Sequence, residues 1–216
     1  MTRRLKIDFV SDVSCPWCVV GLKSLEQALD NLAEAVEADI HFQPFELNPQ
    51  MPPGGQDLNE HLQQKYGGTP EQFAGTREAI RERGEALGFV FRMDKRDRIY
   101  NTFDCHRLLH WAGDVGRQLE LKMALFRAYF TEGLDPGDHA VLLQAVRDVG
   151  LDDARAREIL SSDAYRDEVR AQQQFYASAG ISAVPAVVIN DRYLISGGQP
   201  AATFEQALRE IAAKAD

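Results

Sequence analysis

The chain has 216 residues, of which 44% are hydrophobic and 26% are charged, and its formal net charge is −9 at pH 7. A chain of this length can bury a sizeable core, and its composition is that of an ordinary globular protein. The net acidity excludes general nucleic-acid binding, which needs a basic face, and no apolar run is long enough to span a membrane.

The first predicted element is a short buried strand over residues 5–10, and two cysteines follow it at Cys15 and Cys18. A helical pattern then runs from Val19 to Ala35, with leucines three and four residues apart on one face. A strand, a short loop and a helix that opens on Cys-x-x-Cys form the setting in which a thiol becomes reactive.

The Cys15-Pro16-Trp17-Cys18 segment carries the strongest chemical signal in the chain. Its two cysteines meet across one turn of helix, close enough to form a disulfide. Pro16 suits the first helical position, because its missing N–H costs nothing there. Cys15 is therefore expected at the helix N-terminus, where free N–H groups and the helix dipole favour the thiolate and lower the thiol pKa. The segment predicts a dithiol–disulfide redox pair, with Cys18 as the less exposed partner and no need for a cofactor.

A second strand is expected over residues 40–45, so the chain opens as strand, helix, strand. Three prolines and two glycines between residues 49 and 56 are typical of a linker. Residues 57 to about 180 show helical patterns almost throughout, with a brief extended piece at residues 88–93. Asp57 and Thr69 are predicted helix N-caps. Another helix is predicted from the apolar spacing of Leu119, Met123, Phe126 and Phe130, and we interpret Met123 and the aromatic residues of this face as core.

The third cysteine, Cys105, stands beside two histidines that raise the alternative of a metal site. His106 and His110 lie four residues apart, so they share a helix face and could chelate a metal with Cys105 nearby. Zinc needs a full ligand set, and neither this group nor the Cys15–Cys18 pair has a further Cys/His pair at telling spacing. We therefore predict no metal, and we interpret Cys105 as a buried thiol in a packed helix.

The pattern returns to strands after Gly180. A β-branched run over residues 186–189, the turn signal Asn190-Asp191 and a second run over residues 193–195 predict a hairpin. A final helix follows Gly197-Gly198-Gln199-Pro200, and Phe204, Leu208 and Ile211 share one of its faces.

These elements assemble into an α/β fold with one small mixed sheet that has helices on both faces. We expect residues 1–56 and 163–216 to form one discontinuous domain around this sheet. Residues 57–162 are then an all-helical insertion that covers the redox pair as a lid.

Several separated motifs resemble one known family. They are Asp12-Val-Ser-Cys-Pro-Trp-Cys-Val-Val-Gly21, Pro44-Phe-Glu-Leu-Asn-Pro49, Asn101-Thr-Phe-Asp-Cys-His-Arg-Leu108, Val184-Pro185 and Ser196-Gly-Gly-Gln-Pro200. Together with the order of the elements, they resemble the DsbA-like branch of the thioredoxin-fold proteins, and within it the FrnE-type group.

The resemblance implies a thioredoxin-like fold with a large helical insertion and a thiol:disulfide oxidoreductase activity. By that resemblance Cys15 is the attacking thiol, Cys18 the resolving thiol, and Pro185 a cis-proline that faces the disulfide. It also implies that the Val184 backbone pairs with an extended substrate. From their place around the thiols, we expect Pro16 and Trp17 to contact a protein or peptide substrate that carries a disulfide or thiol.

The expected compartment is the cytoplasm. No export signal is visible at the N-terminus, because Asp8 and Asp12 interrupt the apolar run that such a signal needs. Three cysteines in 216 residues also do not suggest a structural disulfide framework.

Two other function classes stay open. One is a glutathione-dependent transferase or isomerase of the kappa or 2-hydroxychromene-2-carboxylate isomerase type, for which glutathione is the partner. Those relatives keep a single nucleophile and an Asp-Arg pair near the start of the final helix, where this chain has Pro200-Ala201. The other class is a redox sensor whose dithiol changes shape without turnover.

Overall fold

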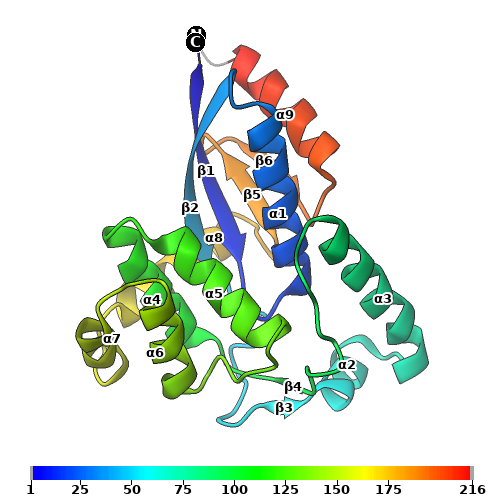
Figure 1. Cartoon of the computed structure of the whole chain (residues 1–216), viewed down its shortest axis with the longest axis vertical. Helices are drawn as coiled ribbons and strands as arrows, with labels where there is room; N and C mark the ends of the chain where they lie inside the picture. The colour runs from blue at the N-terminus through cyan, green and yellow to red at the C-terminus, as the bar shows by residue number, and fades with distance from the viewer. Residues whose placement is uncertain (1, 215–216) are drawn as a thin grey trace.

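A four-stranded mixed sheet lies at the centre of the molecule (Figure 1). The structure is a computed structural model that describes residues 2–214. Its strand order is β2-β1-β5-β6, in which β2 is parallel to β1 while β5 and β6 are antiparallel to their neighbours. The strands are β1 (Arg3–Ser11), β2 (Val36–Pro44), β5 (Ala186–Ile189) and β6 (Tyr193–Ser196).

Helices cover both faces of this sheet because side chains alternate along β1. Ile7 and Phe9 belong to a buried cluster shared with α1 (Pro16–Asn31) and α9 (Ala201–Lys214). Val10 points the other way and packs with Tyr176 of α8 (Arg166–Ser178). In Figure 1, α1 accordingly lies in front of the sheet and α8 behind it. The predicted α/β architecture is confirmed.

The middle of the chain is helical, as predicted. Its helices are α2 (Leu58–Tyr66), α3 (Pro70–Ala86), α4 (Phe103–Asp114), α5 (Gln118–Phe130), α6 (His139–Asp148) and α7 (Asp153–Leu160). Figure 1 shows α2 and α3 on one side of the sheet's lower end and α4 to α7 on the other. The Asp57 and Thr69 caps are confirmed, since the Asp57 carboxylate accepts from the N–H groups of Asn59 and Glu60 and Thr69 forms a capping box with Gln72.

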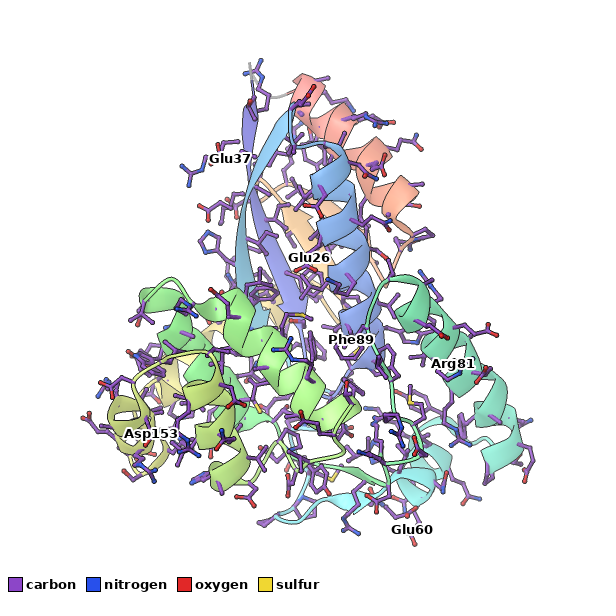
Figure 2. The ribbon with its side chains drawn as sticks, viewed as in Figure 1. Glu26, Glu37, Glu60, Arg81, Phe89 and Asp153 are labelled. Carbon is purple, nitrogen blue, oxygen red and sulfur yellow. The ribbon has the colours of Figure 1, made fainter. Side chains whose placement is uncertain are left out.

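Two apolar cores hold these parts together. The larger core joins the sheet and α1 to Ile80, Phe89 and Phe126 of the middle segment. The smaller one joins α4 to α7 to Val13 in the loop before the cysteines and includes Leu108 and Leu142. Figure 2 shows Phe89 in the interior beside α1, whereas Glu60, Arg81 and Asp153 extend around the outside. Because the larger core crosses the predicted boundary at residue 57, the division into two domains stays a prediction.

Two predicted boundaries were wrong. The helix after the cysteines ends at Asn31, not Ala35, because Leu32 to Ala35 turn the chain so that Val36 can pair with Arg3. The second strand begins at Val36 and ends at Pro44, earlier than the predicted 40–45. Strand β2 lies at the edge of the sheet, so its polar residues face solvent. The apolar residues from which the strand was predicted therefore cover only part of its length.

Further corrections concern the linker and one helix face. The predicted linker contains the buried Met51 and ends in β3 (Gln56–Asp57), which pairs with β4 (Arg98–Ile99). No strand forms at residues 88–93, which run as an irregular segment. On α5, Leu119 is exposed and Met123 only half-buried, whereas Leu121, Lys122 and Leu125 are buried.

The buried residue Arg107 allows a test of what stabilises the helical middle segment. Arg107 of α4 is 2% exposed and donates to the carbonyls of Ala164, Ile159 and Ser162 and to the Asp104 carboxylate. Arg107→Met leaves these acceptors unpaired, so we expect a loss on the order of 3 kcal/mol in the free energy of unfolding. Urea unfolding measures it.

Arg157→Met is the matched control, because the Arg157 side chain is 58% exposed and, within residues 2–214, pairs with Asp153 alone. We expect it to change the free energy of unfolding by less than about 0.5 kcal/mol. Equal losses in the two variants would contradict the structural role of Arg107.

Candidate active site

The two cysteines lie at the start of α1, as the spacing predicts. Cys15 is the N-cap residue with extended backbone angles, and Pro16 occupies the first turn. The Cys18 N–H donates to the Cys15 carbonyl at 3.1 Å. Cys15 is 4% exposed and Cys18 0%, so the predicted order of exposure holds. Cys15 is nevertheless less accessible than its place at a helix end suggests.

The segment Val184-Pro185 faces Cys15, and the peptide bond between these two residues is cis. The Cys15 thiol donates to the Val184 carbonyl over 3.6 Å. The structure thus brings together residues that lie about 170 positions apart in the chain.

Two glycines allow the neighbouring segments to approach α1 closely. A Cβ atom on Gly21 would lie 3.0 Å from Pro185 Cγ and 3.3 Å from Gly198 Cα. A Cβ atom on Gly198 would lie 2.9 Å from the Trp17 carbonyl oxygen. Position 198 therefore requires glycine, and a side chain at position 21 would crowd Pro185 and Gly198. This close contact holds the 197–198 segment against the first turn of α1.

Trp17 lies half-buried between α1, α3 and the 197–198 segment. The Arg83 guanidinium lies over its ring, 5.2 Å from the centroid, and donates to the Gly198 carbonyl at 2.7 Å. The expected partial exposure of Trp17 is present, while its contact with substrate stays a prediction.

Asp12 anchors the loop that carries the cysteines. Its carboxylate, 1% exposed, accepts from the Leu47 N–H at 2.7 Å, the Thr102 hydroxyl at 2.7 Å and the Ser14 hydroxyl at 3.0 Å. His106 Nε2 lies 3.5 Å from Asp12 Oδ1. Although burial raises the pKa of Asp12, His106 and the Leu47 and Thr102 donors lower it to about 2. Asp12 is thus a permanently charged group at neutral pH.

Cys18 is held as a neutral thiol. Burial and the neighbouring Cys15 thiol raise the pKa of Cys18 well above its ordinary value, while the Asp12 backbone N–H and the Lys122 charge act against this. A buried, protonated thiol beside a second thiol is the arrangement expected of a resolving cysteine, which loses its proton only when it attacks.

Cys105, His106 and His110, the candidate metal ligands, each have different neighbours. Cys105 is fully buried in the α4–α7 core, its thiol donates to the Pro136 carbonyl at 3.1 Å, and burial raises its pKa. His106 faces Asp12, whereas His110 lies 3.3 Å from the Gln172 side chain. Within residues 2–214, no three His, Cys, Asp or Glu side chains are grouped as metal ligands.

Two basic residues beside the cysteines were not predicted from the sequence. Lys65 of α2 donates to the Leu47 carbonyl and the Asn48 side chain at 2.8 Å each. Burial lowers the pKa of Lys65, and the nearby Asp12 and Cys15 act against this effect. Arg83 reaches Trp17 from α3. Neither makes an ion pair with a carboxylate of the described residues. Both belong to polar helices whose sequence pattern carries no sign of a site.

A buried lysine on α5, Lys122, was also missed. One signal could have found it, since Lys122, Phe126 and Phe130 recur every four residues and therefore share a helix face.

Comparison with known proteins finds a matching family and relatives of this chain. Residues 6–209 match the model of a family described as the DSBA-like thioredoxin domain. The uncharacterized protein YwbO of Bacillus subtilis is 28% identical over 211 residues, which are 97% of this chain and 98% of that protein.

Solved structures agree with the family match. A probable DsbA oxidoreductase from Streptomyces coelicolor is 34% identical, with a TM-score of 0.87 over 98% of this chain and 92% of that one. The cytosolic disulfide reductase DsbM from Pseudomonas aeruginosa, 17% identical, superposes with a TM-score of 0.66 over 97% and 100% of the two chains. A 2-hydroxychromene-2-carboxylate isomerase, 14% identical, reaches 0.72 over 97% of each. At 17% and 14% identity, the reductase and the isomerase share the fold with this chain.

The Asp12 anchor predicts a pH-dependent effect of Asp12→Asn. Because the pKa of Asp12 is lowered from 3.8 to about 2, its charge stabilises the folded state above pH 4 and stops doing so as the pH falls through 2. The variant should be less stable by about 2 kcal/mol at pH 6 and by about half of that at pH 3. Urea unfolding at both pH values measures the difference.

Asp163→Asn serves as the control, because the Asp163 side chain is 82% exposed and its change should alter stability little at either pH. A deficit of Asp12→Asn that is equal at pH 6 and pH 3 would show that the charge of Asp12 is not what stabilises the loop.

Proposed function

Because the chain belongs to the DSBA-like thioredoxin domain family, we propose that it is a thiol:disulfide oxidoreductase that works through Cys15 and Cys18. The observation that carries this proposal is the pair of thiols at the first turn of α1, one at the helix N-terminus and one fully buried. Proteins and peptides that contain a disulfide or a thiol are the proposed substrates, and the cytoplasm is the proposed compartment. The narrower FrnE-type assignment stays a prediction.

The proposed reaction has two exchanges. The Cys15 thiolate attacks one sulfur of a substrate disulfide, so that a mixed disulfide forms and one substrate thiolate leaves. Cys18 then gives up its proton and attacks the Cys15 sulfur, which releases the second substrate thiol and closes the Cys15–Cys18 disulfide. Run in the opposite direction, the same steps transfer the disulfide to a substrate dithiol.

The surroundings of Cys15 have distinct proposed roles. Val184, half-buried beside the thiol, offers its backbone to an extended substrate, and Pro185 lies behind it against Gly21. Pro16 and Trp17 border the sulfur on the helix side and are proposed to contact the residues that flank the substrate disulfide.

A second candidate is a glutathione-dependent transferase or isomerase. The observation in its favour is the pair of cations, Lys65 and Arg83, that border the dithiol without carboxylate partners in the described part of the chain and could hold an anionic thiol. Two thiols and Pro200-Ala201 at the start of α9 count against it. Tight glutathione binding in calorimetry, with turnover that survives Cys18→Ala, would favour this candidate over the first.

Cysteine variants test the proposal. We expect Cys15→Ser to lower the rate of insulin disulfide reduction by at least about a thousandfold, because no other accessible thiol can begin the exchange. Cys18→Ser should accumulate a mixed disulfide with substrate, which mass spectrometry detects.

Cys105→Ser is the control with matched chemistry, since Cys105 lies in a different core and donates to Pro136. It should keep the activity of the parent protein. Full activity of Cys15→Ser, or its loss in Cys105→Ser with the fold intact, would refute the assignment of the redox pair.

A further inference from the structure

Arg83 of α3 is a half-buried cation whose guanidinium is held by two contacts. It lies over the Trp17 ring, 5.2 Å from the centroid, and its Nη2 atom donates to the Gly198 carbonyl at 2.7 Å. Gly198 itself packs so closely on Trp17 that a Cβ atom there would lie 2.9 Å from the Trp17 carbonyl oxygen. The planar guanidinium is therefore oriented before any ligand arrives, which lowers the entropic cost of binding one.

These contacts leave most of the hydrogen-bonding capacity of Arg83 unused. A guanidinium carries five N–H donors, and in the described part of the chain Arg83 has no carboxylate at ion-pair distance. Arg81, which extends to the outside of the molecule in Figure 2, pairs with both Glu78 and Glu85. The chain has 33 acidic residues for 24 lysines and arginines, so carboxylates are not scarce. Arg83 can thus take a carboxylate from another molecule.

Trp17 connects Arg83 to the redox pair. It stands between Cys15 and Cys18, and its Cα atom lies at most about 7 Å from that of Cys15, because two residues separate them. Trp17 and Arg83 are both partly exposed, so a peptide joined to Cys15 can contact them. An extended peptide advances about 3.3 Å per residue. A side chain two or three residues from the substrate cysteine is therefore within reach of the Arg83 guanidinium.

The overall charge of the protein acts in the opposite direction. With a formal net charge of −9, the chain as a whole repels an acidic peptide and attracts a basic one. Salt screens this long-range effect over about 8 Å at physiological ionic strength, whereas a contact between a half-buried guanidinium and a carboxylate is screened much less. A preference for acidic substrates therefore has to come from a basic residue at the site.

We propose that Arg83 is a specificity-determining residue that binds a substrate carboxylate. The preferred substrates are then peptide disulfides with Asp or Glu two or three residues from the reacting cysteine. This rests on the proposed function, because the carboxylate matters only if the peptide reacts with Cys15. The carboxylate accepts hydrogen bonds from the guanidinium, whose plane is set by Trp17 and Gly198. Arg83 holds the peptide beside the dithiol and takes no part in the exchange of sulfurs.

The test measures single turnovers, with the reduced protein as the only reductant. Three cyclic disulfide peptides differ only at the positions two residues from each cysteine, where they carry Glu, Gln or Lys. Each rate is divided by the rate of the same peptide with dithiothreitol, which corrects for the reactivity of the peptide itself. At about 0.15 M salt we expect the parent protein to reduce the Glu peptide about tenfold faster than the Lys peptide, with the Gln peptide between them.

Arg83→Gln should lower the ratio of the Glu to the Lys rate at least about fivefold and change the rate with the Gln peptide little, because only the charged contact is lost. A merely structural role of Arg83 would instead slow all three peptides alike, and that result would overturn the proposal. Circular dichroism checks the fold of the variant. Equal rates with the Glu and Lys peptides in the parent protein would also overturn it, and this outcome depends on no variant.

Arg77→Gln is the matched control, because Arg77 is a half-buried arginine of the same helix that also has no carboxylate partner in the described part of the chain. It donates to the Asn59 side chain and the Pro70 carbonyl, and its replacement should leave the ratio of the rates unchanged. A preference for Glu that survives Arg83→Gln but disappears in Lys65→Gln would overturn the proposal, since the carboxylate would then bind at α2.

Two further comparisons separate the proposal from its alternatives. Oxidised glutathione also carries carboxylates close to its disulfide, so it is a fourth substrate in the same assay. Dependence on Arg83 with the Glu peptide supports a peptide as the source of the carboxylate, and dependence confined to glutathione would overturn it. A parent protein that reduces none of the peptides would refute the proposed function itself, whereas one that reduces all three equally would refute only the role of Arg83.

Discussion

The placement of the two cysteines depends on one buried carboxylate, that of Asp12. A carboxylate without solvent must have its oxygens occupied by donors, and Asp12 obtains them from the loop after β2, through Leu47, and from the start of α4, through Thr102. Its third partner, Ser14, precedes Cys15 by one residue. The three segments therefore cannot shift independently without leaving a charge unpaired. In this way the helical middle of the chain fixes the loop that ends in Cys15.

The rest of the site is built against this anchor from two directions. From the C-terminal part of the sheet, Val184 and Pro185 cover Cys15, and Gly198 packs on Trp17. From the helical middle, α3 contributes Arg83 over Trp17, and α5 contributes the buried lysine beside the same apolar cluster. The dithiol thus belongs to an apolar cluster and has the basic groups Lys65 and Arg83 close by. Such surroundings give the charge on its sulfurs more influence than it would have in water.

The sequence predicted those features that depend on local pattern. The Cys-x-x-Cys spacing, a proline at N1, and the capping residues Asp57 and Thr69 each follow from groups close together in the chain. The start of β2 was missed because Glu37 and Asp39 face solvent at a sheet edge, where apolar periodicity is weak. Lys65 and Arg83 could not be found, because only the tertiary fold brings them to the cysteines. The low exposure of Cys15 has the same cause, since the segment that covers it is remote in sequence.

The central claim is that Cys15 and Cys18 form one reversible redox pair from which Cys105 is excluded. Equilibrating the protein in glutathione redox buffers, trapping the thiols in acid and mapping them by mass spectrometry tests this directly. The account predicts a single two-electron transition confined to the peptide that contains Cys15 and Cys18, with Cys105 a free thiol throughout. A disulfide that involves Cys105, or a Cys15–Cys18 pair that stays reduced at every buffer ratio, would contradict it.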